Sequence, residues 1–167
     1  SDLATQPQAA LIGDAIGVTS VAYHGGNLYV TSNDQIWRRG ATWVGSGNDW
    51  SNAGIAYGAT AMVSHGGALY VASGGHLWKR NALGPNTGND WAEAGVALGV
   101  TAMASVGGAL YAVSNDHLWK RGALGPDTGN DWTEAGLAFG VRAMTAWNDQ
   151  LYVVSNDALW RRDPGTL

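Results

Sequence analysis

Residues 99–139 read GVTAMASVGGALYAVSNDHLWKRGALGPDTGNDWTEAGLAF, and this stretch decides the fold. Gly107 and Gly108 separate two short apolar runs, VTAMAS and ALYAVS. Asn115 and Asp116 separate the second run from HLWKR, and a longer loop ending in GND leads to WTEAGLAF. Runs of about five or six residues between turn-forming residues are typical of β-strands. Because glycine interrupts every segment before a stable helix could form, the stretch predicts four short antiparallel strands.

The same unit recurs along the chain with a constant step of 41 residues. Two sets of tryptophans keep this step: Trp37, Trp78, Trp119 and Trp160 in one set, and Trp50, Trp91 and Trp132 in the other. Four strands in about 41 residues match one blade of a β-propeller. A blade cannot keep both of its faces dry alone, so neighbouring blades must stack on one another. The sequence therefore predicts an all-β propeller of four 41-residue, four-stranded blades.

The two ends of the chain predict how the ring closes. The last unit, residues 140–167, contains only three predicted strands, whereas residues 9–17 align with residues 50–58 of the second unit. The N-terminal strand can therefore complete the last blade, which would give one propeller domain over residues 9–167 behind a flexible lead at residues 1–8. Alternatively, the chain is half of a larger propeller that a second chain completes. The expected state is accordingly a monomer or a dimer.

Composition and charge exclude several classes of partner. The net charge is −4, which disfavours nucleic acid, and no apolar run is long enough for membrane insertion. The chain has no cysteine, no calcium loop of the EF-hand type and no zinc-ligand spacing, so neither a metal nor a cofactor is expected. The 9 tryptophans can bury large areas, which favours a compact β protein over a disordered chain.

The repeat pattern GxxALYVxSxxxLWKR…GNDW resembles the repeats of β-propeller lectins of the tachylectin-2, tectonin and Photorhabdus-lectin-like group. The resemblance covers residues 9–163. It implies shallow sugar sites between adjacent blades, with fucose- or GlcNAc-type sugars as ligands. Members of this group usually carry more than four blades, so this chain departs from them in blade number.

Three repeated groups of side chains are candidates for ligand contact. The third-strand tryptophans either form inter-blade core or offer one face to a sugar. The arginine at the second position of each basic pair either lies on a solvated outer strand or donates hydrogen bonds to sugar hydroxyls. The GND-Trp motif either forms a blade corner or faces the sugar as well. The predicted ligand-binding residues are Trp37, Arg39, Asn48, Asp49, Trp50, Trp78, Arg80, Asn89, Asp90, Trp91, Trp119, Arg121, Asn130, Asp131, Trp132, Trp160 and Arg162.

The even recurrence of the polar side chains argues against an enzyme. Catalysis needs a nucleophile, a base and an orienting group in one place, but Asp49, Asp90 and Asp131 recur on separate blades. Several weak, equal pockets on one rigid ring would raise avidity for a glycan-coated surface. We therefore expect a multivalent, secreted or extracellular lectin. The alternative is a protein-interaction or structural propeller that belongs to a larger secreted protein.

Because Ala9 stands where the other repeats have tryptophan, three equivalent sites are expected rather than four.

Overall fold

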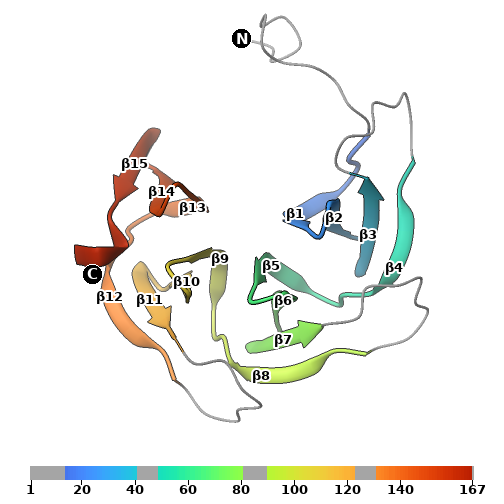
Figure 1. Ribbon diagram of the computed structural model, residues 1–167, viewed down its shortest axis with the longest axis horizontal. Helices are drawn as coiled ribbons and strands as arrows, with labels where there is room; N and C mark the ends of the chain where they lie inside the picture. The colour runs from blue at the N-terminus through green and yellow to red at the C-terminus, as the bar shows by residue number, and fades with distance from the viewer. Residues whose placement is uncertain (1–13, 41–48, 81–89, 123–130, 167) are drawn as a thin grey trace, which may run out of the picture.

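The computed structural model describes residues 14–40, 49–80, 90–122 and 131–166. These residues form fifteen strands in four antiparallel sheets that are arranged around a common axis, as Figure 1 shows. Strands β1, β5, β9 and β13 lie nearest the axis, and consecutive members of this set contact one another. The prediction of an all-β propeller with four blades is confirmed.

Each blade is an antiparallel meander in chain order. Blade 1 contains β1 (Val18–His24), β2 (Asn27–Ser32), β3 (Gln35–Gly40) and β4 (Ser51–Ile55). Blade 2 contains β5 (Ala59–His65), β6 (Ala68–Ser73), β7 (His76–Arg80) and β8 (Ala92–Val96). Blade 3 contains β9 (Val100–Val106), β10 (Ala109–Ser114), β11 (His117–Arg121) and β12 (Thr133–Leu137). Blade 4 contains β13 (Val141–Trp147), β14 (Gln150–Ser155) and β15 (Ala158–Arg162), followed by a 3-10 turn, Pro164–Thr166.

The two-residue turns between the second and third strands explain the repeated Asn-Asp pair. Asn115 and Asp116 have φ values of 50° and 62°, and two positive φ values in a two-residue loop match the twist of a β-hairpin. In blade 2 the same turn is Gly74–Gly75, with φ values of 59° and 80°. Asn, Asp and Gly are the residues that tolerate this backbone, so the substitution between repeats preserves the turn.

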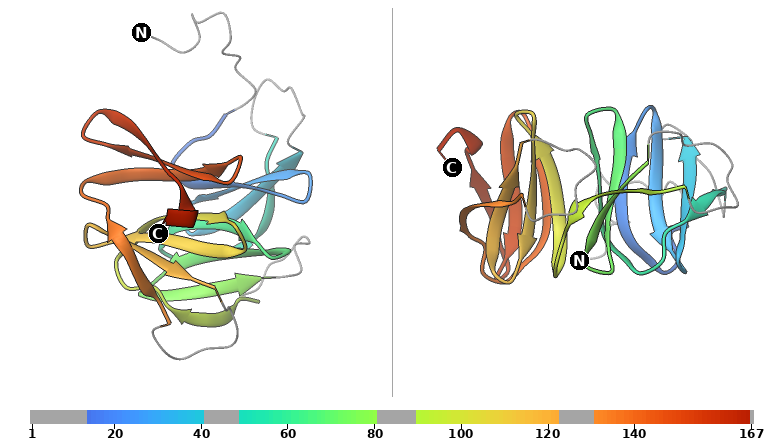
Figure 2. Two further views of the ribbon diagram at one scale, coloured as in Figure 1. Left: turned by 60° about the vertical axis from the view of Figure 1, so that its left-hand side comes forward. Right: turned by 90° about the horizontal axis from the view of Figure 1, so that it is seen from below.

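Most of the apolar core lies between neighbouring blades, in the contacts that we call seams. Ile36 of blade 1 is fully buried in a cluster with Met62 and Leu69 of blade 2. Leu118 of blade 3, 2% exposed, lies in a cluster with Leu151 of blade 4. Figure 2 shows the sheets standing side by side with their faces in contact. Burying such side chains stabilises the fold by about 1.5–3 kcal/mol each, so the seams hold the blades together.

The described residues form three seams, which join β1 to β5, β5 to β9 and β9 to β13. Blade 4 has a three-stranded sheet in the described part of the chain. The N-terminal strand that was predicted to complete it falls on residues 9–17, of which only residues 14–17 are described, and the predicted lead at residues 1–8 also lies outside the described residues. Within the ranges that the structure describes, no helix is long and apolar enough to cross a membrane.

Candidate functional site

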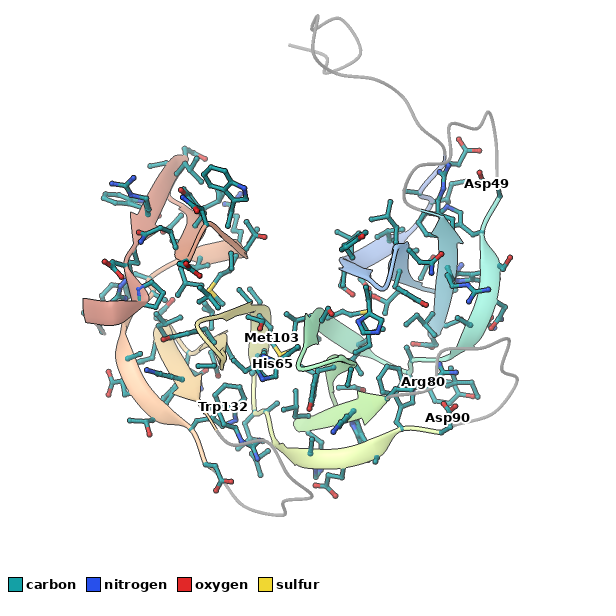
Figure 3. All side chains as sticks on the ribbon, viewed as in Figure 1. Asp49, His65, Arg80, Asp90, Met103 and Trp132 are labelled. Carbon is teal, nitrogen blue, oxygen red and sulfur yellow. The ribbon has the colours of Figure 1, made fainter. Side chains whose placement is uncertain are left out.

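A buried arginine closes the outer part of each seam. Arg80, at the end of β7, is 2% exposed, and its Nη1 donates a hydrogen bond to the carbonyl of Ala53 in β4 of the preceding blade. Its guanidinium also pairs with Asp90, with Nε and Oδ1 2.7 Å apart, as Figure 3 shows on the outer side of the molecule. The arginine therefore links two blades and neutralises the aspartate of the GNDW motif.

The same arrangement recurs in the neighbouring repeats. Arg39 pairs with Asp49 at 3.0 Å, and Arg121 pairs with Asp131 at 3.3 Å. Both arginines are 2–3% exposed. The hypothesis of a solvated outer strand is therefore wrong for these arginines, because their side chains are buried. In blade 4, Arg162 donates to the carbonyls of Ala135 and Leu137 in β12, at 3.0 and 3.3 Å.

A glycine in the fourth strand makes room for each arginine. Gly54 has a φ of 127°, and a Cβ added to it would lie 2.6 Å from Nη1 of Arg80. Gly95 faces Arg121 and Gly136 faces Arg162 in the same way. Only glycine combines this backbone conformation with so close an approach of the guanidinium. These glycines therefore have a packing role at the seam.

The tryptophan of the GNDW motif is held from two sides. The Trp91 ring lies under the Arg80 guanidinium, with 5.6 Å from Cζ to the ring centroid. Its Nε1 donates to the carbonyl of Ile55, at the end of the preceding blade, at 2.5 Å. Trp50 donates to Asp14 and Trp132 to Val96 in the same way, both at 2.6 Å. The arginine and the carbonyl thus fix the ring at the seam by a cation–π contact and a hydrogen bond.

The third-strand tryptophans are fixed within their own blades. Nε1 of Trp37, Trp78 and Trp119 donates to the carbonyl of Ser32, Ser73 and Ser114, respectively, at 3.2 Å in each case. These rings are partly buried. Both tryptophan N–H groups of a repeat are therefore engaged by the protein, and what the rings offer to a ligand is their apolar surface.

Each pair of tryptophans lines a pocket at the entrance to its blade. Seam pocket 1 has a volume of about 250 Å³, seam pocket 2 about 290 Å³ and seam pocket 3 about 160 Å³. They are lined by Trp37 with Trp50, Trp78 with Trp91, and Trp119 with Trp132, respectively. The opposite wall of each pocket is the short segment that enters the blade from the preceding repeat. These volumes lie below the range of about 300–1,000 Å³ for pockets that hold drug-sized ligands, so each pocket suits a single small ring.

The three pockets share aromatic walls but differ at their rims. The rim residue on the incoming segment is Ile16, Tyr57 or Leu98, each at least 62% exposed. Asn33 lines pocket 1 and Asn115 lines pocket 3, whereas Gly74 occupies this position in pocket 2. Pocket 2 is also lined by His76, whose Nδ1 lies 2.8 Å from Oε1 of Glu93.

The structure brings together most of the predicted site residues that it describes, in two layers. Six tryptophans line the pockets: Trp37, Trp50, Trp78, Trp91, Trp119 and Trp132. Behind the second tryptophan of each pair lie the arginine and its aspartate partner, so these groups position the ring. Asn48, Asn89 and Asn130 lie outside the described residues. Trp160 lines none of the three seam pockets and is 56% exposed, and Arg162 holds β12.

Sequence reasoning missed the incoming segments that form one wall of every pocket. Their backbone is held by the second-strand serine, since Ser32 donates to the Ile16 carbonyl at 2.9 Å and Ser114 to the Leu98 carbonyl at 2.5 Å. A signal was present: alanine recurs at positions 15, 56, 97 and 138 and serine at 32, 73, 114 and 155 with the same step of 41 residues. Small residues at fixed repeat positions indicate a close approach of two backbones.

Away from the pockets, two histidines join the inner strands. Nδ1 of His24 lies 2.7 Å from the Ser64 hydroxyl, and Nδ1 of His65 lies 2.6 Å from the Ser105 hydroxyl, so each pair bridges adjacent blades. Figure 3 places His65 near the axis. Burial lowers the pKa of His65 because it disfavours the charged imidazolium. In the part of the chain that the structure describes, no group of three or more His, Cys, Asp or Glu residues could hold a metal ion.

Comparison with known proteins supports the fold alone. No protein-family model matches the chain, and no curated protein sequence is similar to it. A symmetrical protein from a study of de novo evolutionary emergence under folding constraints has a TM-score of 0.70 and 19% identity, over 93% of this chain and 74% of that one. Myxococcus xanthus glutaminyl cyclase has a TM-score of 0.60 and 14% identity, over 90% of this chain and 67% of the cyclase.

A further similar structure belongs to a much longer protein. It is the extracellular domain of a hybrid two-component system from B. thetaiotaomicron, with a TM-score of 0.55 and 14% identity over 89% of this chain. This chain spans 20% of the length of that domain. All three similarities are below 20% identity, so they establish the arrangement of strands and leave the function to be argued from the pockets.

Proposed function

We propose that this chain is a multivalent carbohydrate-binding protein with one small neutral-sugar site at each of its three seam pockets. The observation that carries the proposal is the pair of fixed tryptophans in every pocket. Sugar rings present apolar C–H faces, and rigid aromatic surfaces bind such faces well. Because both indole N–H groups of each pair are already bonded to protein carbonyls, stacking is the main contribution of these rings.

Polar groups at the rims would select the sugar. Asn33 and Asn115 each carry both hydrogen-bond donors and an acceptor, and they line pockets 1 and 3. In pocket 2 the hydroxyl of Tyr57 and the imidazole of His76 take this role. Among the described residues, no arginine or lysine lines a seam pocket, which favours neutral sugars, of the fucose or GlcNAc type, over acidic ones.

The buried arginines act indirectly in this proposal. Arg39, Arg80 and Arg121 hold the second tryptophan of each pair in place and contribute no direct contact to the sugar. Three weak sites on one rigid body would bind a glycan-coated surface with high avidity, which fits a secreted lectin. We propose no catalytic role, since the described polar groups are distributed evenly over the blades.

A glycan array tests this proposal. The wild-type chain is expected to bind a small set of neutral glycans, and one free sugar should compete for binding and shift the tryptophan fluorescence. The variant Trp37→Leu/Trp78→Leu/Trp119→Leu should lose binding, because one wall of every pocket is removed.

Trp160→Leu provides the matched control, since Trp160 occupies the same repeat position but lines none of the three pockets. It should keep the glycan profile of the wild type. Circular dichroism and thermal unfolding of all variants show whether the fold survives. Absence of any glycan signal for the folded wild type would refute the proposal and would favour a protein-interaction role.

A further inference from the structure

One end of the row of blades exposes a residue that is core everywhere else. Leu159 in β15 is 70% exposed, whereas its equivalents Leu77 and Leu118 are 0% and 2% exposed. Val154, which pairs with Leu159 from the neighbouring strand β14 and so shares its face of the sheet, is 40% exposed. We call Val154 and Leu159 the trailing face. A side chain that is buried at two other seams has the shape and polarity of a seam residue, so the trailing face is half of a seam.

The other end exposes the complementary half. Val21 in β1 is 60% exposed, whereas its equivalents Met62 and Met103 are each 5% exposed. Tyr23, two residues further along the same strand, is 62% exposed. We call Val21 and Tyr23 the leading face. In the described part of the chain, these are the two blade faces left without a neighbouring blade.

The internal seams show which residues would meet. Ile36 of blade 1 shares a cluster with Met62 and Leu69 of blade 2, and Leu118 shares one with Met144 and Leu151 of blade 4. Leu159 is the blade 4 equivalent of Ile36, and Val21 and Leu28 are the blade 1 equivalents of Met62 and Leu69, at a step of 41 residues. The same contact at a fourth seam would therefore join Leu159 to Val21 and Leu28. The two faces are therefore matched by the repeat itself.

We propose that the trailing face of one copy of this chain binds the leading face of a second copy and so forms a fourth seam between chains. Within a single copy the two faces lie apart, on opposite sides of the opening between β13–β15 and β1–β4 in Figure 1. Closing that opening within one chain would require repacking of seams whose core residues are 0–8% exposed. Such cores resist continuous deformation. A second copy supplies the missing face through the type of contact that the chain already uses three times.

The backbone at the start of the described chain supports this mode of joining. Asp14 accepts a hydrogen bond from Trp50 as Ile55 accepts one from Trp91. Ile55 is the last residue of β4, so Asp14 lies where the fourth strand of a preceding blade would end. Blade 1 of the second copy would therefore arrive with its incoming segment in register with the outer edge of β15, which pairs with no further strand among the described residues, and pairing would cover that edge.

The contact is heterologous, because two different faces meet. Such contacts either close into a ring or continue into an open assembly, and both give a mass above that of one chain. Multi-angle light scattering over a range of concentrations is expected to show species larger than 17.4 kDa that dissociate on dilution. Leu159→Asp and Val21→Asp should each give the single-chain mass at every concentration.

Leu98→Asp is the control for these charge substitutions. Leu98 is 65% exposed, close to the value for Leu159, but it lies at a pocket rim away from both end faces. This variant should assemble as the wild type does. A wild type that remains at 17.4 kDa at high concentration would overturn the proposal.

Crosslinking distinguishes contact between chains from contact within one. The chain has no cysteine, so Leu159→Cys and Val21→Cys can each carry a unique thiol. Mixing the two single variants with a short bismaleimide should give a crosslinked pair that contains one chain of each kind, and neither variant alone should give it in comparable yield. Absence of the mixed pair, or an internal link in the double variant Val21→Cys/Leu159→Cys in place of links between chains, would show that the proposal is wrong.

Discussion

At the scale of the residue, the glycine and arginine that face each other across a seam decide whether two blades can approach. The guanidinium of Arg121 occupies the space that a side chain at position 95 would need, and Gly95 has a φ of 129°. Two separate costs would therefore follow from any other residue there, one from the backbone and one from overpacking. The seam depends on the absence of a single Cβ atom.

Gly95→Ala is expected to lower the free energy of unfolding by about 2–6 kcal/mol, since backbone strain and overpacking cost about 1–3 kcal/mol each. Gly107→Ala is the matched control. Gly107 also has a positive φ, 59°, but nothing lies within 4 Å of an added Cβ, so only about 1–2 kcal/mol should be lost. Urea unfolding of both variants measures the difference. Equal losses would contradict the packing role of Gly95.

His65 predicts a pH dependence of stability. Burial lowers its pKa in the folded protein below the ordinary value of 6.5. Between pH 6.5 and the lowered pKa, the unfolded chain binds a proton at His65 that the folded chain does not bind. The stability that comes from the neutral His65 is therefore fully present above pH 6.5 and is lost as the pH falls through the lowered pKa. We expect His65→Gln to lose less stability than the wild type between about pH 7.5 and 5. Urea midpoints at both pH values test this, and parallel curves for the two proteins would exclude a contribution from His65.

At the scale of the element, the hairpin turns and the incoming segments shape the pockets. The turn between the second and third strands carries Asn33 and Asn115 to the rims of pockets 1 and 3, whereas Gly74 leaves the rim of pocket 2 open. The backbone at Gly74 has a φ of 59°, and nothing lies within 4 Å of an added Cβ. One position can therefore change the rim without disturbing the hairpin.

Gly74→Asn should change the free energy of unfolding by less than about 1 kcal/mol, because asparagine tolerates this backbone and reduces the freedom of the unfolded chain. The same substitution gives pocket 2 the rim asparagine of pockets 1 and 3, so it should raise sugar affinity at pocket 2 and leave pockets 1 and 3 unchanged. Thermal unfolding and calorimetric titration measure the two effects. Gly74→Val is the control for the backbone, since a β-branched residue at positive φ should destabilise the hairpin. Unchanged affinity of folded Gly74→Asn at all three sites would show that this rim does not select the ligand.

Strands and turns were predictable from the sequence because their causes are local. The turn residues Asn115 and Asp116 and the apolar runs beside them delimit β10 and β11 as the structure shows them. The direction in which Arg80 points was not predictable, since a charged residue at the end of an outer strand suits solvent as well as a seam. Its burial follows from Gly54 in the preceding blade, 26 residues earlier, and the effect of a glycine there appears only when two blades are packed together.

At the scale of the whole molecule, the 41-residue step repeats one local arrangement and gives three pockets, each lined by a tryptophan pair. Every blade with both tryptophans has a pocket at the same place, whereas the described part of blade 4 has Trp160 but no tryptophan at the repeat position of Trp50, Trp91 and Trp132. The sequence predicted the paired tryptophans and their recurrence. It did not predict the end faces. Leu159, Leu77 and Leu118 are the same residue at the same repeat position, so the exposure of Leu159 depends only on how the blades are arranged.

The number of sugars bound per chain tests the central claim most directly. Calorimetric titration with the sugar that competes best in the glycan array should give a stoichiometry of three per chain, since three pockets are lined by a tryptophan pair. Trp78→Leu should reduce this number to two, and Trp160→Leu should leave it at three. A stoichiometry that is unchanged by Trp78→Leu in a folded protein would place the binding site elsewhere and would contradict the account.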